Sequence, residues 1–167
     1  MKTKIFVLLV MCLFLFMSFT QGSAENAKVD MKKVADKILK AMNSGDAAAV
    51  SRLYTEDATM TMSGEPEPVR GRKAIEETQA AWFRAFPGVK MEFPTVLISE
   101  NYIVIEMIMK GTNSGSFASP EGDIPATGRA VSLKGIMILK TTPEGLIAED
   151  HTYYDTADFM KQLGLMK

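Results

Sequence analysis

The stretch Gly145-Leu-Ile-Ala-Glu-Asp-His-Thr-Tyr-Tyr-Asp155, near the end of the chain, holds the only histidine, His151. Pro143-Glu144-Gly145 sets a turn at its start, and its Ile, Thr and Tyr residues suit a pleated surface. The stretch is therefore predicted to be a strand. Because side chains alternate across a strand, one face is expected to carry Ile147, Glu149, His151, Tyr153 and Asp155. Two interpretations of that polar face stay open, a solvated sheet face or the wall of a site.

Three more strands are predicted ahead of this stretch. They are rich in Ile, Val and Met and cover residues 89–99, 102–110 and 129–140. Pro94 indicates a bulge or an edge position in the first of them, because proline cannot donate to a sheet ladder. A long loop is expected over 111–128, which is rich in Gly, Ser, Pro and Asp.

Helices are predicted before the strands. Asp30 and Asp46 are favourable N-caps for two of them, the second covering 47–54, and the apolar spacing of 73–86 indicates a third. A short strand is expected at 58–62 and a last helix at 156–163. Helices followed by a run of neighbouring strands predict an α+β fold, with N-terminal helices packed on a curved antiparallel sheet and a pocket at its open end.

The N-terminus has the pattern of a secretory signal peptide. Lys2 and Lys4 precede an apolar run over 5–16, and Gly22-Ser23-Ala24 offers small residues for cleavage. The run is short for a membrane span, and Met11 before Cys12 argues against a lipid anchor. The expected organisation is a cleaved segment over 1–24 and a single domain over 25–167, in a periplasmic or secreted bacterial protein with no stable membrane anchor.

Composition excludes several classes of function for the mature chain. Cleavage would remove the only cysteine, so no thiol nucleophile or thiolate metal site is expected. Removing Lys2 and Lys4 from the 19 Lys and Arg leaves 17 against 20 Asp and Glu, a net charge near −3 that argues against nucleic acid as a partner. With one histidine and no phosphate loop, dinucleotide fingerprint or Gly-x-Ser-x-Gly elbow, neither a metal nor an organic cofactor is predicted.

Five short phrases, in their order and spacing, carry a family resemblance. They are Gly45-Asp46 ahead of Tyr54-Thr-Glu-Asp57-Ala58, Val69-Arg-Gly-Arg-Lys-Ala-Ile75, Gly111-Thr-Asn-Ser-Gly115, Pro125-Ala-Thr-Gly-Arg129, and Glu149 to Asp155 leading to Gln162-Leu-Gly164. The chain resembles the SnoaL-like polyketide cyclase and ester cyclase family, within the nuclear transport factor two-like superfamily. The resemblance implies a cone-shaped α+β barrel and a homodimer.

The resemblance also implies a reaction. Cyclases of this kind close rings by an aldol-type step without metal or organic cofactor, using a carboxylate near the end of the chain inside an apolar pocket. The position that matches is Asp155. Burial among apolar side chains disfavours a charged carboxyl group, so both of its forms can take part in proton transfer. Asp155 also suits the N-cap of the last helix, and the two roles are compatible.

Three positions depart from the family pattern. Asn113 stands where relatives often have a histidine, His151 where they often have a tryptophan, and Met107 near a position that also tends to carry a tryptophan. A pocket with a different lining is therefore expected, and a polyketide substrate does not carry over.

The other candidate site residues each have a structural alternative. His151 is predicted to be a second acid/base group or a partly buried strand histidine. Glu149 fits a substrate-binding residue or a solvated face residue, and Tyr153 a substrate-binding residue or a packing residue with its hydroxyl at the rim. Tyr54 and Trp82 fit a pocket lining or a core. Arg129 suits a substrate carboxylate or a salt bridge.

Three functions remain open at this point. The first is an exported, cofactor-independent cyclase, isomerase or lyase that acts on a small apolar carbonyl compound, with Asp155 as acid/base and His151 and Tyr153 orienting the substrate oxygen. The second is a binding protein that holds a small apolar molecule in the same pocket without chemistry. The third is a dimeric interaction domain, in which an exposed sheet face pairs two subunits.

Overall fold

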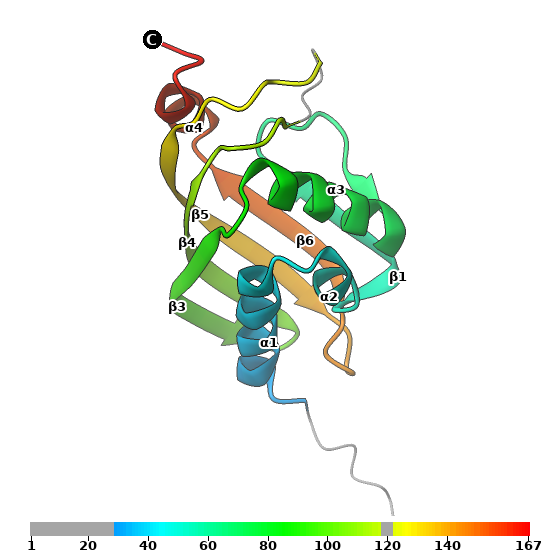
Figure 1. Cartoon of the computed structure of the whole chain (residues 1–167). Coiled ribbons are helices and arrows are strands. Elements are labelled where there is room, and N and C mark those ends of the chain that lie inside the picture. The colour runs from blue at the N-terminus through cyan, green and yellow to red at the C-terminus, as the bar shows by residue number, and fades with distance from the viewer. Residues whose placement is uncertain (1–28, 118–121) are drawn as a thin grey trace, which may run out of the picture.

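The computed structural model describes residues 29–117 and 122–167, so the predicted signal segment over 1–24 lies outside the described residues. The described chain folds into four helices and six strands (Figure 1). In chain order they are α1 (Met31–Ser44), α2 (Ala47–Ser51), β1 (Tyr54–Met62), β2 (Val69–Arg70), α3 (Arg72–Ala85), β3 (Lys90–Ser99), β4 (Tyr102–Thr112), β5 (Ala130–Thr141), β6 (Ile147–Tyr154) and α4 (Thr156–Leu163). The fold is the predicted α+β class.

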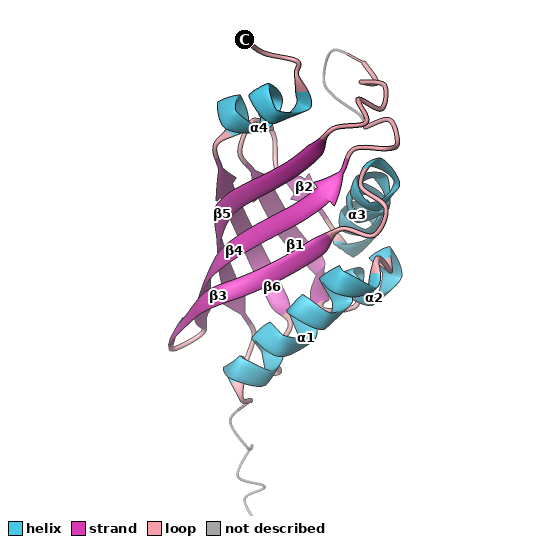
Figure 2. Ribbon diagram, turned by 60° about the vertical axis from the view of Figure 1, so that its left-hand side comes forward, coloured by secondary structure: helices cyan, strands magenta, loops and turns pink. Residues whose placement is uncertain are grey.

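The strands form one curved, unclosed sheet in the order β2-β1-β6-β5-β4-β3, and α1, α2 and α3 cover its concave face (Figure 2). β3 to β6 pair antiparallel with their neighbours, as predicted. One pair departs from the predicted antiparallel sheet, because β1 runs parallel to β6. Parallel neighbours need a long crossover, and here the whole of β2 to β5 provides it.

Three aspartates start helices in the way the sequence predicts. Asp30 and Asp46 accept backbone N–H groups at the starts of α1 and α2, and Asp155 does so for α4. Gly45 ends α1 with a φ of 68°, a left-handed conformation that glycine adopts without a steric penalty. The second helix is shorter than predicted: it ends at Ser51, because Tyr54 already pairs with Ile147 in the sheet.

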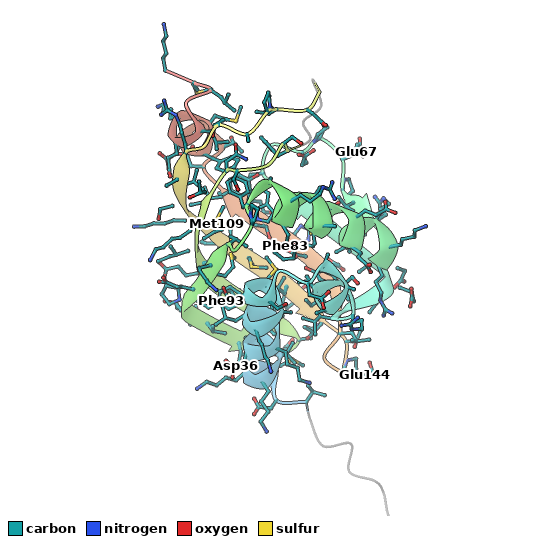
Figure 3. The ribbon with its side chains drawn as sticks, viewed as in Figure 1. Asp36, Glu67, Phe83, Phe93, Met109 and Glu144 are labelled. Atoms are coloured by element: carbon teal, nitrogen blue, oxygen red, sulfur yellow. The ribbon has the colours of Figure 1, made fainter. Side chains whose placement is uncertain are left out.

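Strand alternation places the core on the helix-covered face. Along β4, Ile103, Ile105, Met107 and Met109 are buried, and the residues between them are exposed or half-buried. Figure 3 shows the labelled Met109 inside the molecule and Asp36 and Glu144 on its surface. None of the helices in the described part of the chain has the length and apolar character needed to cross a membrane.

The register shifts at three places in the sheet, one of them between Tyr54 and Thr59 of β1, and the shift in β6 determines which of its residues face the helices. In β3 the register shifts between Glu92 and Thr95, which confirms the irregularity predicted at Pro94 in an edge strand. In β6, Thr141 of β5 pairs with Ile147, whereas its neighbour Lys140 pairs with Glu149. Ala148 is therefore an extra residue. Because of this extra residue, the next side chain after Ile147 to point toward the helices is that of Asp150, not Glu149.

Loops at the open end of the sheet are tied together by Asn113, which is fully buried. Its side chain donates to the carbonyls of Ala85 and Gly115 and accepts the N–H of Thr127. At the other end of α3, the Arg72 guanidinium donates to the Tyr54 carbonyl at 2.6 Å. Asn113 and Arg72, each from one of the family phrases, therefore hold loops in place, because their side chains bond backbone groups that have no partner within a helix or strand.

Candidate active site

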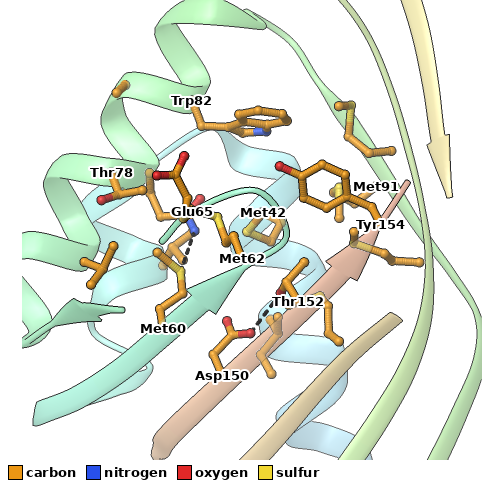
Figure 4. A pocket seen from close by; sticks show the side chains of 18 of the residues that line it. Met42, Met60, Met62, Glu65, Thr78, Trp82, Met91, Asp150, Thr152 and Tyr154 are labelled. Atoms are coloured by element: carbon orange, nitrogen blue, oxygen red, sulfur yellow. Dashed lines mark hydrogen bonds between the residues drawn. The ribbon is translucent and has the colours of Figure 1, made fainter. Parts of the chain in front are cut away.

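A cavity of about 390 Å³ lies between the sheet and the helices (Figure 4). Its volume is near the lower end of the range of roughly 300–1,000 Å³ that is usual for small-molecule sites. Every strand and the first three helices contribute to its wall, together with Glu65 on the β1–β2 loop and Phe117. The fold therefore builds a single chamber from segments far apart in the chain.

Methionines make up much of the apolar lining. They are Met42, Met60, Met62, Met91, Met107, Met109 and Met137. Methionine has three rotatable bonds and a polarisable sulfur, so such a wall adapts to ligands of different shape. The lining provides apolar contact and little fixed shape.

Asp150 is the buried acid of the cavity. It lies on the inward face of β6 and is 2% exposed. The Tyr54 hydroxyl donates to its Oδ2 at 2.6 Å, and the Thr152 hydroxyl donates to its Oδ1 at 2.9 Å. Two donors fix the plane of the carboxyl group, and each oxygen keeps a lone pair for a ligand.

Burial sets the protonation of this pair. Desolvation raises the pKa of Asp150 above its ordinary value, and the hydrogen bonds from Tyr54 and Thr152 oppose that rise. Burial also raises the pKa of Tyr54, and the neighbouring Asp150 charge raises it further. The Tyr54 hydroxyl therefore remains a neutral donor to Asp150.

A polar stripe continues along β6 from Asp150. Thr152 and Tyr154 follow it on the inward face, and all three line the cavity. Burial raises the pKa of the Tyr154 hydroxyl, and the nearby charge of Glu65 adds to the rise. Alternate residues of a strand lie about 6.6 Å apart, so the stripe spans roughly 13 Å from Asp150 to Tyr154.

Gln79 of α3 is a second buried polar group in the wall, 9% exposed. Its Nε2 faces the Met60 sulfur at 3.8 Å, which Figure 4 marks as a dashed line. A thioether is a weak acceptor, so this amide keeps most of its capacity to donate to a ligand oxygen.

Three predicted site residues line the cavity: Tyr54, Trp82 and Met107. Tyr54 acts on Asp150 through its hydroxyl, and Trp82 packs against Phe86 with ring centroids 4.7 Å apart. Met107 extends the methionine wall. The predicted lining of the pocket is thus partly present.

The structure places the predicted polar face of β6 on the opposite side of the sheet. Glu149, His151 and Tyr153 pair with residues of the outer face, because the extra residue Ala148 reverses the alternation counted from Ile147. There the Lys140 Nζ donates to Glu149 at 2.6 Å and lowers its pKa. The His151 Nε2 lies 3.7 Å from the Glu149 Oε2. The prediction that Ile147 shares a face with these residues is wrong.

Asp155, Arg129 and Asn113 also lie outside the cavity wall. Asp155 is exposed and accepts the Asp158 N–H at 2.9 Å as the cap of α4, so the expectation that it sits in an apolar pocket is wrong. The Arg129 guanidinium lies against Gly164 at the end of α4. Asn113 is buried among loop carbonyls, as described above. These three residues support the fold around the site.

Asp150, Thr152 and Gln79 are the residues that the sequence interpretation missed. Gln79 had a visible signal, because it lies at helical spacing between Ile75 and Trp82 on the apolar side of α3. The described residues contain no group of three or more His, Cys, Asp or Glu side chains that could hold a metal ion. The chemistry within reach of this cavity is proton transfer by Asp150, with hydroxyl and amide donors around it.

Comparison with known proteins identifies the family. A family model for the SnoaL-like domain matches residues 35–150. The chain belongs to the SnoaL-like domain family. The matched region runs from α1 to Asp150, so it includes the cavity wall up to its buried acid.

Solved structures show the same fold at low sequence identity. A putative SnoaL-like polyketide cyclase from Jannaschia sp. superposes with a TM-score of 0.68 and 17% identity, over 81% of this chain and 94% of that one. A protein with a ketosteroid isomerase-like fold from Catenulispora acidiphila gives 0.67 and 18%, over 80% and 93%. A putative isomerase from Bacillus subtilis gives 0.66 and 19%, over 81% and 93%. No curated protein sequence matches this chain significantly.

Proposed function

We propose that this protein is a cofactor-independent isomerase or cyclase that acts on a small apolar carbonyl compound, with Asp150 as its acid/base. The observation that carries the proposal is a 2% exposed carboxyl group that lines an apolar cavity and has a raised pKa. A general base works best when its pKa approaches the working pH, and burial moves Asp150 in that direction. Membership of the SnoaL-like family supports the same class of chemistry.

The proposed step begins with the carboxylate form of Asp150. It removes a proton from the carbon next to the substrate carbonyl, and the electrons of the broken C–H bond move into the carbonyl to give an enolate. In the isomerisation of a β,γ-unsaturated ketone the enolate is conjugated with the C=C bond, and Asp150 returns the proton to the γ carbon, so that the double bond moves next to the carbonyl. In a ring closure the enolate carbon bonds to a second carbonyl carbon, and the oxygen of that carbonyl takes the proton from Asp150.

Gln79 is the proposed donor to the enolate oxygen. Among the described residues its Nε2 donates to the Met60 thioether, so a substrate oxygen can replace that weak contact. Tyr54 and Thr152 hold the carboxyl group in place. Substrate volume is limited by the cavity of about 390 Å³.

The test is deuterium exchange followed by NMR. In D₂O the wild-type protein is expected to exchange the protons next to the carbonyl of an apolar ketone such as 2-decalone. Asp150→Asn should slow that exchange by roughly 10²–10⁴-fold, the usual contribution of a general base. Asp155→Asn is the matched control, since asparagine caps a helix about as well as aspartate. Equal exchange by wild type and Asp150→Asn, or a loss confined to Asp155→Asn, contradicts the assignment.

A binding protein is the second candidate, and the two hydrogen bonds that Asp150 already accepts favour it. Tyr54 and Thr152 already satisfy one lone pair on each oxygen, as they would in a purely structural network. In that case ketones bind to wild type and Asp150→Asn alike, and neither protein exchanges protons. Titration calorimetry with 2-decalone beside the exchange experiment separates the two functions.

The outer face of the sheet supports a homodimer, which we propose as the assembled form. Leu97, Ile136 and Tyr153 are 62%, 47% and 52% exposed there. The same face carries both signs of charge, in Lys140 and Glu149, so two copies related by a twofold axis can complement each other. Sedimentation velocity should give a dimer for wild type and a single chain for Ile136→Lys. A wild-type monomer at high concentration would contradict the proposal.

Export is proposed on the N-terminal pattern alone. Its residues, 1–24, lie outside the described part of the chain. Mass spectrometry of the protein purified from a bacterial periplasm would show whether the chain begins at Glu25.

A further inference from the structure

The cavity wall carries negative charge and no positive charge. Its ionisable side chains are Glu65 and Asp150, with the phenols of Tyr54 and Tyr154, and among the described residues no Lys, Arg or His lines it. A ligand carboxylate or phosphate would lose its hydration beside two acids without gaining a cationic partner, which is costly. The wall therefore selects against anions.

Glu65 marks the end of the cavity that opens to solvent. It is exposed and follows Gly64, whose φ of 89° turns the chain after β1. Figure 4 shows its carboxylate at the same end as Trp82 and Tyr154, with Asp150 at the other end. The charge of Glu65 contributes to the raised pKa of Tyr154, so the two groups lie near each other. Trp82, Tyr154 and Glu65 are called the mouth below.

Aromatic rings surround this mouth. Trp82 and Tyr154 both pack against Phe159 of α4, with ring centroids 5.9 Å and 6.0 Å from it. Phe117, which also lines the cavity, lies 6.2 Å from the same ring. Packing against Phe159 fixes the positions of these rings, so they offer a preformed aromatic wall beside a carboxylate. The faces of such rings attract organic cations, tryptophan most strongly.

We propose that the mouth binds an organic cation, so that the ligand is an apolar molecule with a protonated amine or quaternary ammonium group at one end. This rests on the proposed function for the other end of the ligand, where the reacting carbonyl group meets Asp150. The stripe along β6 separates the two ends by roughly 13 Å, a distance that a ligand with a short apolar body can span.

Binding of three probes with similar apolar length tests this: hexyltrimethylammonium, 1-octanol and octanoate. Trp82 is the only tryptophan of the chain, so its fluorescence reports binding at the mouth directly. The cation is expected to bind about tenfold more tightly than the alcohol, within the range of a desolvated cation–π contact, and octanoate more weakly than either. Raising the salt concentration should weaken only the cation.

Matched variants locate the effect. Glu65→Gln should weaken binding of hexyltrimethylammonium by about three- to tenfold, whereas Glu67→Gln, two residues along the same loop and outside the cavity wall, should leave it unchanged. Figure 3 labels Glu67 on that loop. Calorimetry with Trp82→Leu and the control Phe83→Leu makes the same comparison for the ring, since only Trp82 lines the cavity.

Octanoate binding as tightly as the cation, or equal affinities for the cation in Glu65→Gln and wild type, would overturn the proposal. The exchange experiment tests the proposed function independently of the cation site, because 2-decalone carries no charge and so does not need that site. Loss of ketone exchange in Asp150→Asn together with equal binding of octanoate and the cation keeps the function and removes the cation site. Tight cation binding with undiminished ketone exchange in Asp150→Asn keeps the cation site and removes the proposed function.

Discussion

The two faces of β6 carry side chains of the same kinds in opposite surroundings. On the inner face Asp150 is buried with Tyr54 and its pKa is raised. On the outer face Glu149 is half-exposed beside Lys140 and its pKa is lowered. Because the two acids are neighbours in sequence and both are carboxyl groups, their surroundings decide the direction in which each pKa shifts.

Removing a buried side chain should separate the two faces most strongly. Ile105→Ala on the inner face, where Ile105 is 0% exposed, is expected to lower the free energy of unfolding by about 2–5 kcal/mol. Ile136→Ala on the outer face, at 47% exposure, should cost less than about 1 kcal/mol. Urea unfolding of both variants at low protein concentration measures the difference. Similar losses would show that the outer face is also buried in the assembly.

A matched pair of tyrosines sharpens the comparison. Tyr54→Phe deletes the 2.6 Å hydrogen bond to Asp150 and should cost about 1.5–3 kcal/mol, as for bonds to charged groups. Tyr153→Phe on the exposed face should stay within about 0.5 kcal/mol of wild type. Chemical denaturation gives both values. An unchanged stability in Tyr54→Phe would mean that Asp150 is neutral and weakly bound at the pH of the measurement.

The pH dependence of stability should have opposite signs on the two faces. The folded pKa of Asp150 is raised above its ordinary value of 3.8, so its contribution is full below that pH and is lost as pH rises through the folded pKa. The stability of Asp150→Asn relative to wild type should therefore increase from pH 4 to pH 7. Unfolding curves at several pH values measure it.

Glu149 is the counterpart in this experiment. Its folded pKa is lowered from 4.5 by the Lys140 hydrogen bond, so its contribution is present above that pH and is lost as pH falls through the folded pKa. The stability of wild type relative to Glu149→Gln should therefore decrease on acidification. Slopes of the same sign for the two carboxyl groups would contradict the assignment of Asp150 as the buried acid.

Local signals in the sequence predicted the elements well. Asp30, Asp46 and Asp155 mark helix starts because an N-cap depends only on its own turn of chain. Pro94 marks an irregular edge for a similarly local reason. The parallel pairing of β1 with β6 was not predictable in this way, because it depends on how residues about ninety positions apart meet in the sheet.

The candidate site was harder to predict, because the inward residues of β6 are assigned by counting every second residue from one that is known to point inward. Counting from Ile147 gives Glu149, His151 and Tyr153, and the extra residue Ala148 makes Asp150, Thr152 and Tyr154 the inward set. None of the residue types in Ile147-Ala-Glu-Asp150 is typical of a bulge, so the sequence does not indicate one. The family phrases did not correct the count, since Gln162 binds the backbone of Ser132 and docks α4 on β5. They identify the fold and not the reacting group.

The extra residue Ala148 also has a consequence for comparing homologues. A relative that lacks the insertion presents the other half of its last strand to the cavity, even when every letter after the insertion is aligned with this chain. Two residues aligned with each other in β6 then point to opposite faces of the sheet in the two proteins. Residues of the last strand should therefore be compared between members of the family by which of them face the cavity, because a change of one residue in length can move the cavity wall to the outer surface without altering a single side chain.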